Sequence, residues 1–315
     1  MRIVVTGGAG FIGSHLVDAY VGAGHEVVVV DSLWSHGGGR RENIPEGVSF
    51  VHMDIRDDAG LQRIFSDFKP EIVSHHAAQH SVAIGSRDPK YDANVNVIGM
   101  LNVLEAAVKA GSRKVVFASS AATYGDVETM PVDESSPQRP VSPYGITKMV
   151  TEHYLRFFKS EHGLDFAALR YGNVYGPRQD PNGEAGVIAI FLGKFLQRQG
   201  VRIDWDGEQT RDYVYVGDVV RANVAALTKG SGEIFAIGTG KKTSVNEIYR
   251  AMVEVTGFEP PVTHAPRRPG DAREVFFDPS KARRELGWEA DVPLVEGMRQ
   301  TYAYFREKER TAAAS

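Results

Sequence analysis

Cysteine is absent from the 315-residue chain, so disulfide bonds, thiolate nucleophiles and cysteine metal ligands are excluded. Long hydrophobic runs are missing too, because no apolar stretch is long enough to span a bilayer. Glycines interrupt the opening segment MRIVVTGGAGFIG, where a signal peptide needs a continuous apolar core. We therefore expect a soluble protein with a cytoplasmic location and no membrane partner.

A large excess of charge of one sign is also missing. The formal net charge is −4 at pH 7, and the neighbours Arg40 and Arg41 form too small a basic cluster to attract nucleic acid. We expect no nucleic-acid partner. The hydrophobic content of 42% is ordinary, and a chain of this length can bury a large core in one or two domains.

The first third of the chain alternates short β-branched runs with helical patterns. Valine and isoleucine fill both faces of the runs, which is typical of strands in a parallel sheet covered by helices on both sides. The sequence therefore predicts an α/β protein with a doubly wound parallel sheet. The runs are RIVVTG, EVVVVD, VSFVHMD, EIVSHHAA and KVVFASS.

Beyond about residue 170 the pattern loosens into loops rich in glycine, proline and charge, such as YGPRQDPNGEAG and HAPRRPGDAR. We expect residues 1–170 to form the cofactor-binding domain. DYVYVGDVV and EIFAIG, within 213–240, are expected to return to the sheet. Residues 171–212 and 241–315 are expected to form a smaller C-terminal α/β domain that binds the substrate.

A glycine-rich turn joins the first expected strand to the first helix. Its segment TGGAGFIG spaces the glycines as GxxGxxG. Glycine lets the backbone turn tightly and approach a pyrophosphate, whose charge the N–H groups and dipole of the following helix bind. A plain turn is the alternative, but the strand–turn–helix context favours a dinucleotide site formed by Gly7, Gly10, Phe11, Ile12 and Gly13.

Asp31 ends the second expected strand, where a carboxylate accepts hydrogen bonds from the adenosine ribose and repels a 2′-phosphate. This position favours NAD over NADP, although Arg40 and Arg41 follow it closely. After the third strand, Asp54 and Ile55 are candidates for the adenine site. Asp54 is equally suited to capping the next helix.

The segment SPYGITK places a tyrosine and a lysine four residues apart. Ser142 is a good N-cap and Pro143 suits the first helical position, so a helix is expected from there through MVTEHYLRFFKSEHG. Tyr144 and Lys148 then lie one turn apart on one face. The spacing alone does not separate a catalytic pair from a packed tyrosine beside a solvated lysine.

Six motifs in order and in register decide between these alternatives. The chain carries TGGAGFIG, SSAATYG, SPYGITK, YGNVYGPRQDPNGEAGVIAIF, GEQTRDYVYVGDVVRA and APRRPGDAR. It thereby resembles the extended short-chain dehydrogenase/reductase family from end to end, and most of all its UDP-glucose 4-epimerase branch. The resemblance implies a Rossmann fold, NAD as cofactor and a UDP-sugar as substrate.

The resemblance also implies a catalytic set. Tyr144 would be the acid/base, Lys148 would bind the nicotinamide ribose, and Ser120 would hydrogen-bond O4 of the sugar. A nearby ammonium and the positive nicotinamide ring both favour a phenolate. We therefore expect the pKa of Tyr144 to fall from its ordinary value of about 10 towards neutrality.

The absence of side chains that relatives use for other reactions narrows the possible reaction types. Relatives that dehydrate a nucleotide hexose carry an Asp-Glu pair where this chain has Ala122 and Thr123, and the glutamate of the related decarboxylases is absent as well. We therefore expect NAD-dependent epimerisation at C4 of a UDP-hexose through a transient 4-keto sugar. The alternatives are a net nucleotide-sugar oxidoreductase and a non-catalytic dinucleotide sensor.

The substrate contacts are implied by resemblance alone. Asn173, Arg211 and Arg268 match positions that contact the diphosphate, and Asp271 matches one that contacts the uridine ribose. Arginine suits diphosphate because its fork pairs two oxygens. Arg178 either reaches the sugar or supports its loop.

Two departures from the family concern the ends of the substrate. Relatives commonly read IFGDGEQTRD, whereas Asp204 and Trp205 here leave the stacking of uracil open. Val275 matches a position that gates the space beside C2 of the sugar, which favours acceptance of UDP-N-acetylglucosamine. Ala121 and Ala122 replace hydroxyl residues of relatives that handle a uronic acid, so UDP-glucuronate is disfavoured without being excluded.

Two further features are interpreted conservatively. His75, His76 and His80 lack the spacing of a zinc site, so no metal is expected. The helices EAAVKAG and HYLRFFK mainly face the core, and by resemblance one of them would pair across a homodimer.

Overall fold

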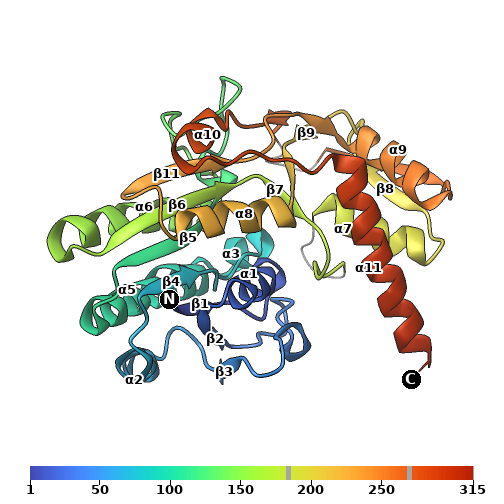
Figure 1. Cartoon of the computed structure of the whole chain (residues 1–315). Coiled ribbons are helices and arrows are strands. Elements are labelled where there is room, and N and C mark those ends of the chain that lie inside the picture. Colours follow the sequence, from blue (N-terminus) through green and yellow to red (C-terminus); the bar gives the residue numbers. More distant parts are fainter. Residues whose placement is uncertain (182–185, 268–271, 315) are drawn as a thin grey trace.

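A parallel sheet of seven strands lies at the centre of the protein (Figure 1). The computed structural model describes residues 1–181, 186–267 and 272–314. The order β11-β6-β5-β4-β1-β2-β3 reverses beside β1, as in a doubly wound fold, so the predicted fold class is confirmed. The strands are β1 (Arg2–Thr6), β2 (Glu26–Asp31), β3 (Ser49–His52), β4 (Ile72–His75), β5 (Lys114–Ser120), β6 (Asp165–Tyr171) and β11 (Glu233–Ile237).

Alternate strand residues supply two separate cores. In β1, Ile3 and Val5 face one cluster and Val4 faces the other, because successive side chains of a strand point to opposite faces. One face is covered by α1 (Phe11–Gly22), α8 (Val216–Ala226) and α10 (Ser280–Leu286). The other is covered by α2 (Asp58–Phe68), α5 (Gly99–Ala110) and α6 (Pro143–His162).

Helix α6 begins and ends as its sequence predicts. The hydroxyl of Ser142 accepts a hydrogen bond from the Gly145 N–H at 3.1 Å, and Pro143 occupies the first turn. Gly163 ends the helix with φ of 69°, a conformation that suits glycine. Three short helical segments pack against α6. They are α3 (Val82–Arg87), α4 (Pro89–Ala93) and a π-helical turn (Asn94–Ile98).

A third core lies at one end of the molecule, where α7, α9 and α11 gather (Figure 1). It is formed by α7 (Val187–Leu196), β8 (Val201–Asp204), α9 (Val245–Thr256), β13 (Val262–Ala265) and α11 (Leu294–Ala314). Nearby, β9 (Thr210–Arg211) pairs with β12 (Thr243–Ser244) and β14 (Glu274–Val275). The 3₁₀ turns are Arg41–Asn43 and Ala121–Thr123.

One part of the expected sheet return is wrong. β11 joins the main sheet beside β6, but β10 (Tyr213–Tyr215) pairs with β7 (Asn173–Tyr175) in a separate two-stranded sheet. The reason is a switch of backbone partners: the Gly172 N–H bonds to β11, whereas the next N–H, that of Asn173, bonds to the Asp212 carbonyl. Helix α10, expected in the substrate domain, packs on the main sheet instead.

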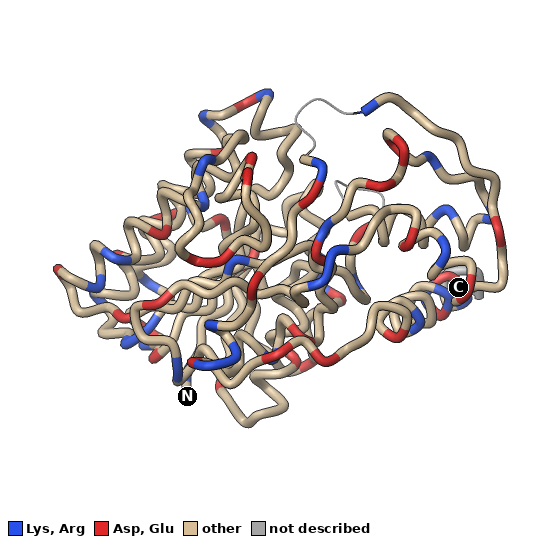
Figure 2. Tube along the Cα trace, turned by 90° about the horizontal axis from the view of Figure 1, so that it is seen from above, with Lys and Arg blue, Asp and Glu red and all other residues tan. Residues whose placement is uncertain are grey.

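Charged residues of both signs are interspersed along the chain (Figure 2). No region of a single sign dominates this view, which agrees with the small net charge. None of the helices within the described residues combines the length and the apolar content needed to cross a membrane.

Candidate active site

A cavity of about 660 Å³ lies at the carboxyl ends of the central strands, where open α/β sheets bind ligands. Its lining brings together the glycine-rich turn, the ends of β2 and β3, and two side chains of α6. All the predicted cofactor residues line it: Gly7, Gly10, Phe11, Ile12, Gly13, Asp31, Asp54, Ile55 and Lys148.

Two glycines of the turn are required by close backbone contacts. Gly7 has φ of 71°, and a Cβ there would lie 2.5 Å from the Ala77 nitrogen. A Cβ on Gly13 would lie 2.1 Å from the Gly7 carbonyl oxygen. Helix α1 starts at this turn without a side-chain cap. Its first N–H groups are therefore available to bind a phosphate in the cavity. These residues fit a dinucleotide pyrophosphate.

Asp31 is held in place by the backbone. Its carboxylate accepts hydrogen bonds from the Leu33 N–H at 2.8 Å and the Ala9 N–H at 3.0 Å. Burial raises its pKa, and these two bonds oppose the rise. Arg40 lies 3.9 Å from Glu42, and Arg41 sits over the Phe50 ring at 5.1 Å. Neither arginine lines the cavity, whereas Asp31 does.

Asp54 lies at the end of the cavity where we expect the adenine, and it does not cap helix α2. Helix α2 is capped by Asp57, which accepts from the Gly60 N–H at 2.9 Å. Asp54 instead pairs with Arg56 at 2.7 Å, and this hydrogen bond holds the pKa of the carboxyl below its usual range. Sequence reasoning missed Arg56, which also lines the cavity and directly follows the predicted Asp54 and Ile55.

Two aromatic residues of this end were also missed. The rings of Trp34 and Tyr91 lie 6.0 Å apart, and the Arg56 guanidinium lies 5.3 Å from the Tyr91 ring. Trp34 lies shortly after Asp31, which ends β2, and this proximity in the sequence was a usable signal. Tyr91 comes from α4, and no local pattern assigns a residue of that helix to the cavity.

Tyr144 and Lys148 both face the cavity. The side chain of Lys148 is only 3% exposed, so the alternative of a solvated lysine is wrong. Its ammonium donates a hydrogen bond to the Ala118 carbonyl at 2.7 Å, and it lies 4.7 Å from the Phe117 ring and 5.7 Å from the Tyr144 ring. The pair is therefore anchored to the end of β5.

The expected fall in the pKa of Tyr144 is not found in the protein by itself. Burial raises this pKa to about 12, and the hydrogen bond from Ser120 opposes the rise. Burial also lowers the pKa of Lys148 to about 8, while Asp92 and Glu152 oppose that fall. Desolvation outweighs the opposing interactions of each group, because the phenol and the ammonium are both enclosed.

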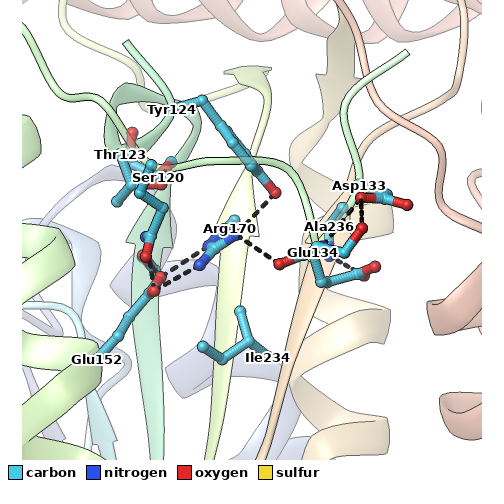
Figure 3. A network of polar contacts seen from close by, with 12 residues as sticks. Ser120, Thr123, Tyr124, Asp133, Glu134, Glu152, Arg170, Ile234 and Ala236 are labelled. Carbon is cyan, nitrogen blue, oxygen red and sulfur yellow. Dashed lines mark hydrogen bonds and ion pairs between the residues drawn. The ribbon is translucent and has the colours of Figure 1, made fainter. Parts of the chain in front are cut away.

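A buried ion pair supports the end of β5 (Figure 3). Glu152 accepts from the Ser119 hydroxyl at 2.6 Å and pairs with Arg170, which also donates to the Tyr124 hydroxyl at 2.9 Å. Ser119 therefore has a structural contact. Ser120 lies next to it, accepts from the Ala122 N–H at 3.1 Å, and hydrogen-bonds Tyr144.

The residues expected to bind the substrate are only partly gathered. Arg178 lines the cavity but pairs with Asp18 of α1 at 2.7 Å, and its φ is 68°. Arg211 donates to the carbonyls of Thr210 and Ala272. The described residues that line the cavity do not include Ser120, Asn173, Arg211 or Val275. The expected contacts of Arg268 and Asp271 lie outside the described residues.

Trp205 is engaged with two arginines. The guanidinium groups of Arg267 and Arg273 lie 4.7 and 4.6 Å from its ring, and Arg273 also pairs with Asp206 at 2.8 Å. The backbone of Trp205 has φ of 62°, which is uncommon for a residue other than glycine. Its indole thus belongs to a local cation–π cluster.

The histidines of the HHAAQH segment have separate partners. His75 lies 2.7 Å from the Thr6 hydroxyl, and His76 lies 3.2 Å from the Tyr171 hydroxyl. Burial lowers the pKa of both, that of His76 to about 3. Within residues 1–181, 186–267 and 272–314, no three His, Asp or Glu side chains are arranged to hold a metal ion.

A glycine turn, a carboxylate at the end of β2 and a tyrosine–lysine pair over one cavity define a dinucleotide-dependent protein of the short-chain dehydrogenase type. The sequence model of the NAD dependent epimerase/dehydratase family matches residues 3–238, and the chain belongs to this family. The expected fold, family and NAD dependence are thereby confirmed.

Three proteins similar to this chain are UDP-glucose 4-epimerases. UDP-glucose 4-epimerase of Thermotoga maritima, solved with UDP-glucose, is 49% identical, with a TM-score of 0.95 over 98% of this chain and 100% of that one. The enzyme of that name from Thermus thermophilus, solved with NAD, is 46% identical, with a TM-score of 0.92 over 97% and 99%. That of Mycolicibacterium smegmatis is 45% identical over 98% of this chain and 99% of its own length.

Proposed function

We propose that this protein is an NAD-dependent UDP-hexose 4-epimerase that interconverts UDP-glucose and UDP-galactose. The observation that carries the proposal is the placement of Ser120, Tyr144 and Lys148 together at the end of β5, beside a cavity that fits a dinucleotide. The UDP-glucose 4-epimerases that match essentially the whole chain support it.

Each catalytic side chain has a role in this proposal. Tyr144 takes the proton from the sugar's O4, and Ser120 holds that oxygen beside the phenol. Bound NAD supplies the reversible hydride acceptor for C4. Lys148 binds the nicotinamide ribose and places its positive charge near Tyr144, which favours the phenolate against the burial that raises its pKa. The 4-keto sugar would then be reduced on its other face, with Tyr144 returning the proton to O4.

The remaining contacts are assigned by the same proposal. The glycine turn, Asp31, Asp54 and Ile55 bind the dinucleotide. The predicted sugar-nucleotide residues Asn173, Arg178, Arg211, Arg268, Asp271 and Val275 bind the UDP-sugar. We accordingly assign residues 1–170 with β11 to the cofactor, and 171–212 with most of 241–315 to the substrate.

The environment of Thr123 supports epimerisation over dehydration. Its hydroxyl donates to the Ser120 carbonyl at 2.9 Å, and its side chain is fully buried. Ala122 beside it carries no titratable group. These positions therefore offer no acid and base for removing water across C5 and C6 of the sugar.

The test is incubation of the purified protein with UDP-glucose, UDP-galactose, UDP-glucuronate and UDP-N-acetylglucosamine, without added reductant. We expect interconversion of the first two at C4 with no net change in NADH absorbance. A stoichiometric rise in NADH with oxidised sugar would identify an oxidoreductase instead. Tight NAD binding with no product from any sugar would favour a non-catalytic sensor.

Acceptance of an N-acetyl group depends in this proposal on Val275. This half-buried residue lies on β14, paired in register with Arg211 of β9. Valine leaves room that tyrosine would fill, at an overpacking cost of roughly 1–3 kcal/mol. Val275→Tyr should therefore slow UDP-N-acetylglucosamine selectively. Equal slowing of both sugars would refute the gate.

An exposed apolar stripe supports the homodimer that we include in the proposal. Ile146 and Phe157 of α6 are 45% and 51% exposed and lie eleven positions apart, which places them on one helix face, and Ile98 before α5 is 50% exposed. Light scattering should show a dimer, and Phe157→Glu should weaken it. A monomeric wild type would refute the proposed homodimer.

We also propose a cytoplasmic location, which cell fractionation tests.

A further inference from the structure

Asp92 is a fully buried carboxylate on α4, next to the catalytic helix α6. Its oxygens accept hydrogen bonds from the Gln79 amide at 2.7 Å, the Asn96 amide at 3.2 Å and the Thr147 hydroxyl at 3.0 Å. All three donors are neutral. Among the described residues, no lysine or arginine lies within ion-pairing distance of Asp92. A negative charge buried in this way is costly, so its retention calls for a compensating role.

The contact with Thr147 ties this carboxylate to the catalytic pair. Thr147 lies between Tyr144 and Lys148 in the sequence, and its hydroxyl is also 3.0 Å from the Tyr144 carbonyl. Asn96 reinforces the contact, because its amide lies 3.3 Å from the same hydroxyl. Asn96 belongs to a π-helical turn, a distortion that is frequent at functional sites. The cluster therefore fixes the first turn of α6.

We propose that Asp92 is a positioning residue whose buried negative charge keeps Lys148 in its ammonium form while its hydrogen bond to Thr147 fixes the first turn of α6. The positioning part stands on the hydrogen bond between Asp92 and Thr147 and on the burial of Asp92 where α4 packs against α6. Its consequence for catalysis rests on the proposed epimerase function.

The surroundings of Lys148 leave Asp92 as the main compensating charge. Burial makes His75 of β4 and its neighbour His76 poor proton acceptors, and Glu152 is already paired with Arg170. Burial lowers the pKa of Lys148 to about 8, and Asp92 opposes that fall more strongly than Glu152 does. The titratable groups that face Lys148 are His75 at the end of β4, His76 directly after it, Tyr144 and Glu152 from α6, and Asp92 from α4.

The experiment follows the Lys148 side chain directly. The protein with NAD bound is labelled with ¹³C at the lysine Cε positions, Lys148 is assigned with Lys148→Arg, and its chemical shift is recorded against pH. Asp92→Asn should lower the titration midpoint by about one pH unit or more, because an opposite charge close by is worth that much. Thr147→Val is the matched control, since it removes the hydrogen bond but keeps the charge, and its midpoint should stay within about 0.3 of wild type.

An unchanged midpoint in folded Asp92→Asn would overturn the proposal, and so would an equal shift in Thr147→Val. If Asp92→Asn does not fold, Asp92→Ser replaces it. That variant also removes the charge and should lower the midpoint by a similar amount, whereas no shift would again overturn the proposal. In the epimerase assay, Asp92→Asn should move the alkaline limb of kcat/KM to lower pH by the same amount. A wild type without epimerase activity would refute the proposed function and leave the titration result intact.

Discussion

Glu152 and Arg170 form a buried, two-pronged ion pair, with 2.9 Å between Oε1 and Nε and 2.7 Å between Oε2 and Nη2 (Figure 3). Each side chain is 2% exposed. The pair joins α6 to β6, and its hydrogen bonds with Ser119 and Tyr124 reach the end of β5. The segment that carries Ser120 is thus supported by a charge pair whose members are eighteen positions apart in the chain.

The first prediction concerns stability. Glu152→Gln leaves the Arg170 guanidinium buried without a countercharge, so we expect a loss of about 3–5 kcal/mol in the free energy of unfolding, measured by urea denaturation. The double variant Glu152→Met with Arg170→Leu should lose much less, because no unpaired charge remains. The exposed pair of Glu42 and Lys308 provides the control, and Glu42→Gln should cost under about 1 kcal/mol. Equal losses for the two single variants would contradict the argument.

The second prediction concerns chemistry. Tyr144→Phe removes the hydroxyl that we propose exchanges a proton with O4, while leaving the ring in place. We expect turnover to fall by about two orders of magnitude or more, since positioned proton transfer contributes about 10²–10⁴-fold, with NAD still bound. Tyr154→Phe, on the same helix, should keep its activity. Full turnover in Tyr144→Phe would exclude the tyrosine as acid/base.

The third prediction compares two glycines of α1. Gly13→Ala places a Cβ 2.1 Å from the Gly7 carbonyl, so the turn must shift, and NAD affinity measured by calorimetry should fall at least about tenfold. Gly22→Ala meets no atom within 4 Å. It should retain NAD and gain about 0.4–1 kcal/mol of stability, because alanine reduces the entropy of the unfolded chain. Unchanged NAD affinity in Gly13→Ala would show that the turn is not the pyrophosphate site.

The fourth prediction concerns pH and stability. Burial holds the pKa of His75 well below 6.5, so below about pH 6.5 the unfolded chain binds a proton that the native protein does not. Stability should therefore fall with decreasing pH, by about 1.4 kcal/mol per pH unit for this residue. His75→Gln should reduce the slope of unfolding free energy against pH between 5 and 6 by up to that amount. The exposed His162 serves as control, and an unchanged slope in His75→Gln would show that His75 titrates alike in both states.

Much of the fold and the cofactor site was predictable because the signals are local. The β-branched runs predicted the strands, and the cap at Ser142 with the proline after it predicted the start of α6. The glycine spacing predicted the turn between β1 and α1, where the structure leaves no room for a Cβ on Gly7 or Gly13. Motif order along the chain indicated the family. Each of these depends on residues a few positions apart, where backbone geometry alone fixes the outcome.

Tertiary structure decided what depends on burial and on partners far apart in the chain. It reversed the expected direction of the Tyr144 pKa, because burial of the phenol raises the pKa by more than the hydrogen bond with Ser120 lowers it. It placed β10 beside β7 rather than in the main sheet, and it matched Glu152 with Arg170 and Asp92 with Thr147. Motif spacing contains neither the degree of desolvation nor the identity of a distant partner, and both set the energy of a buried charge.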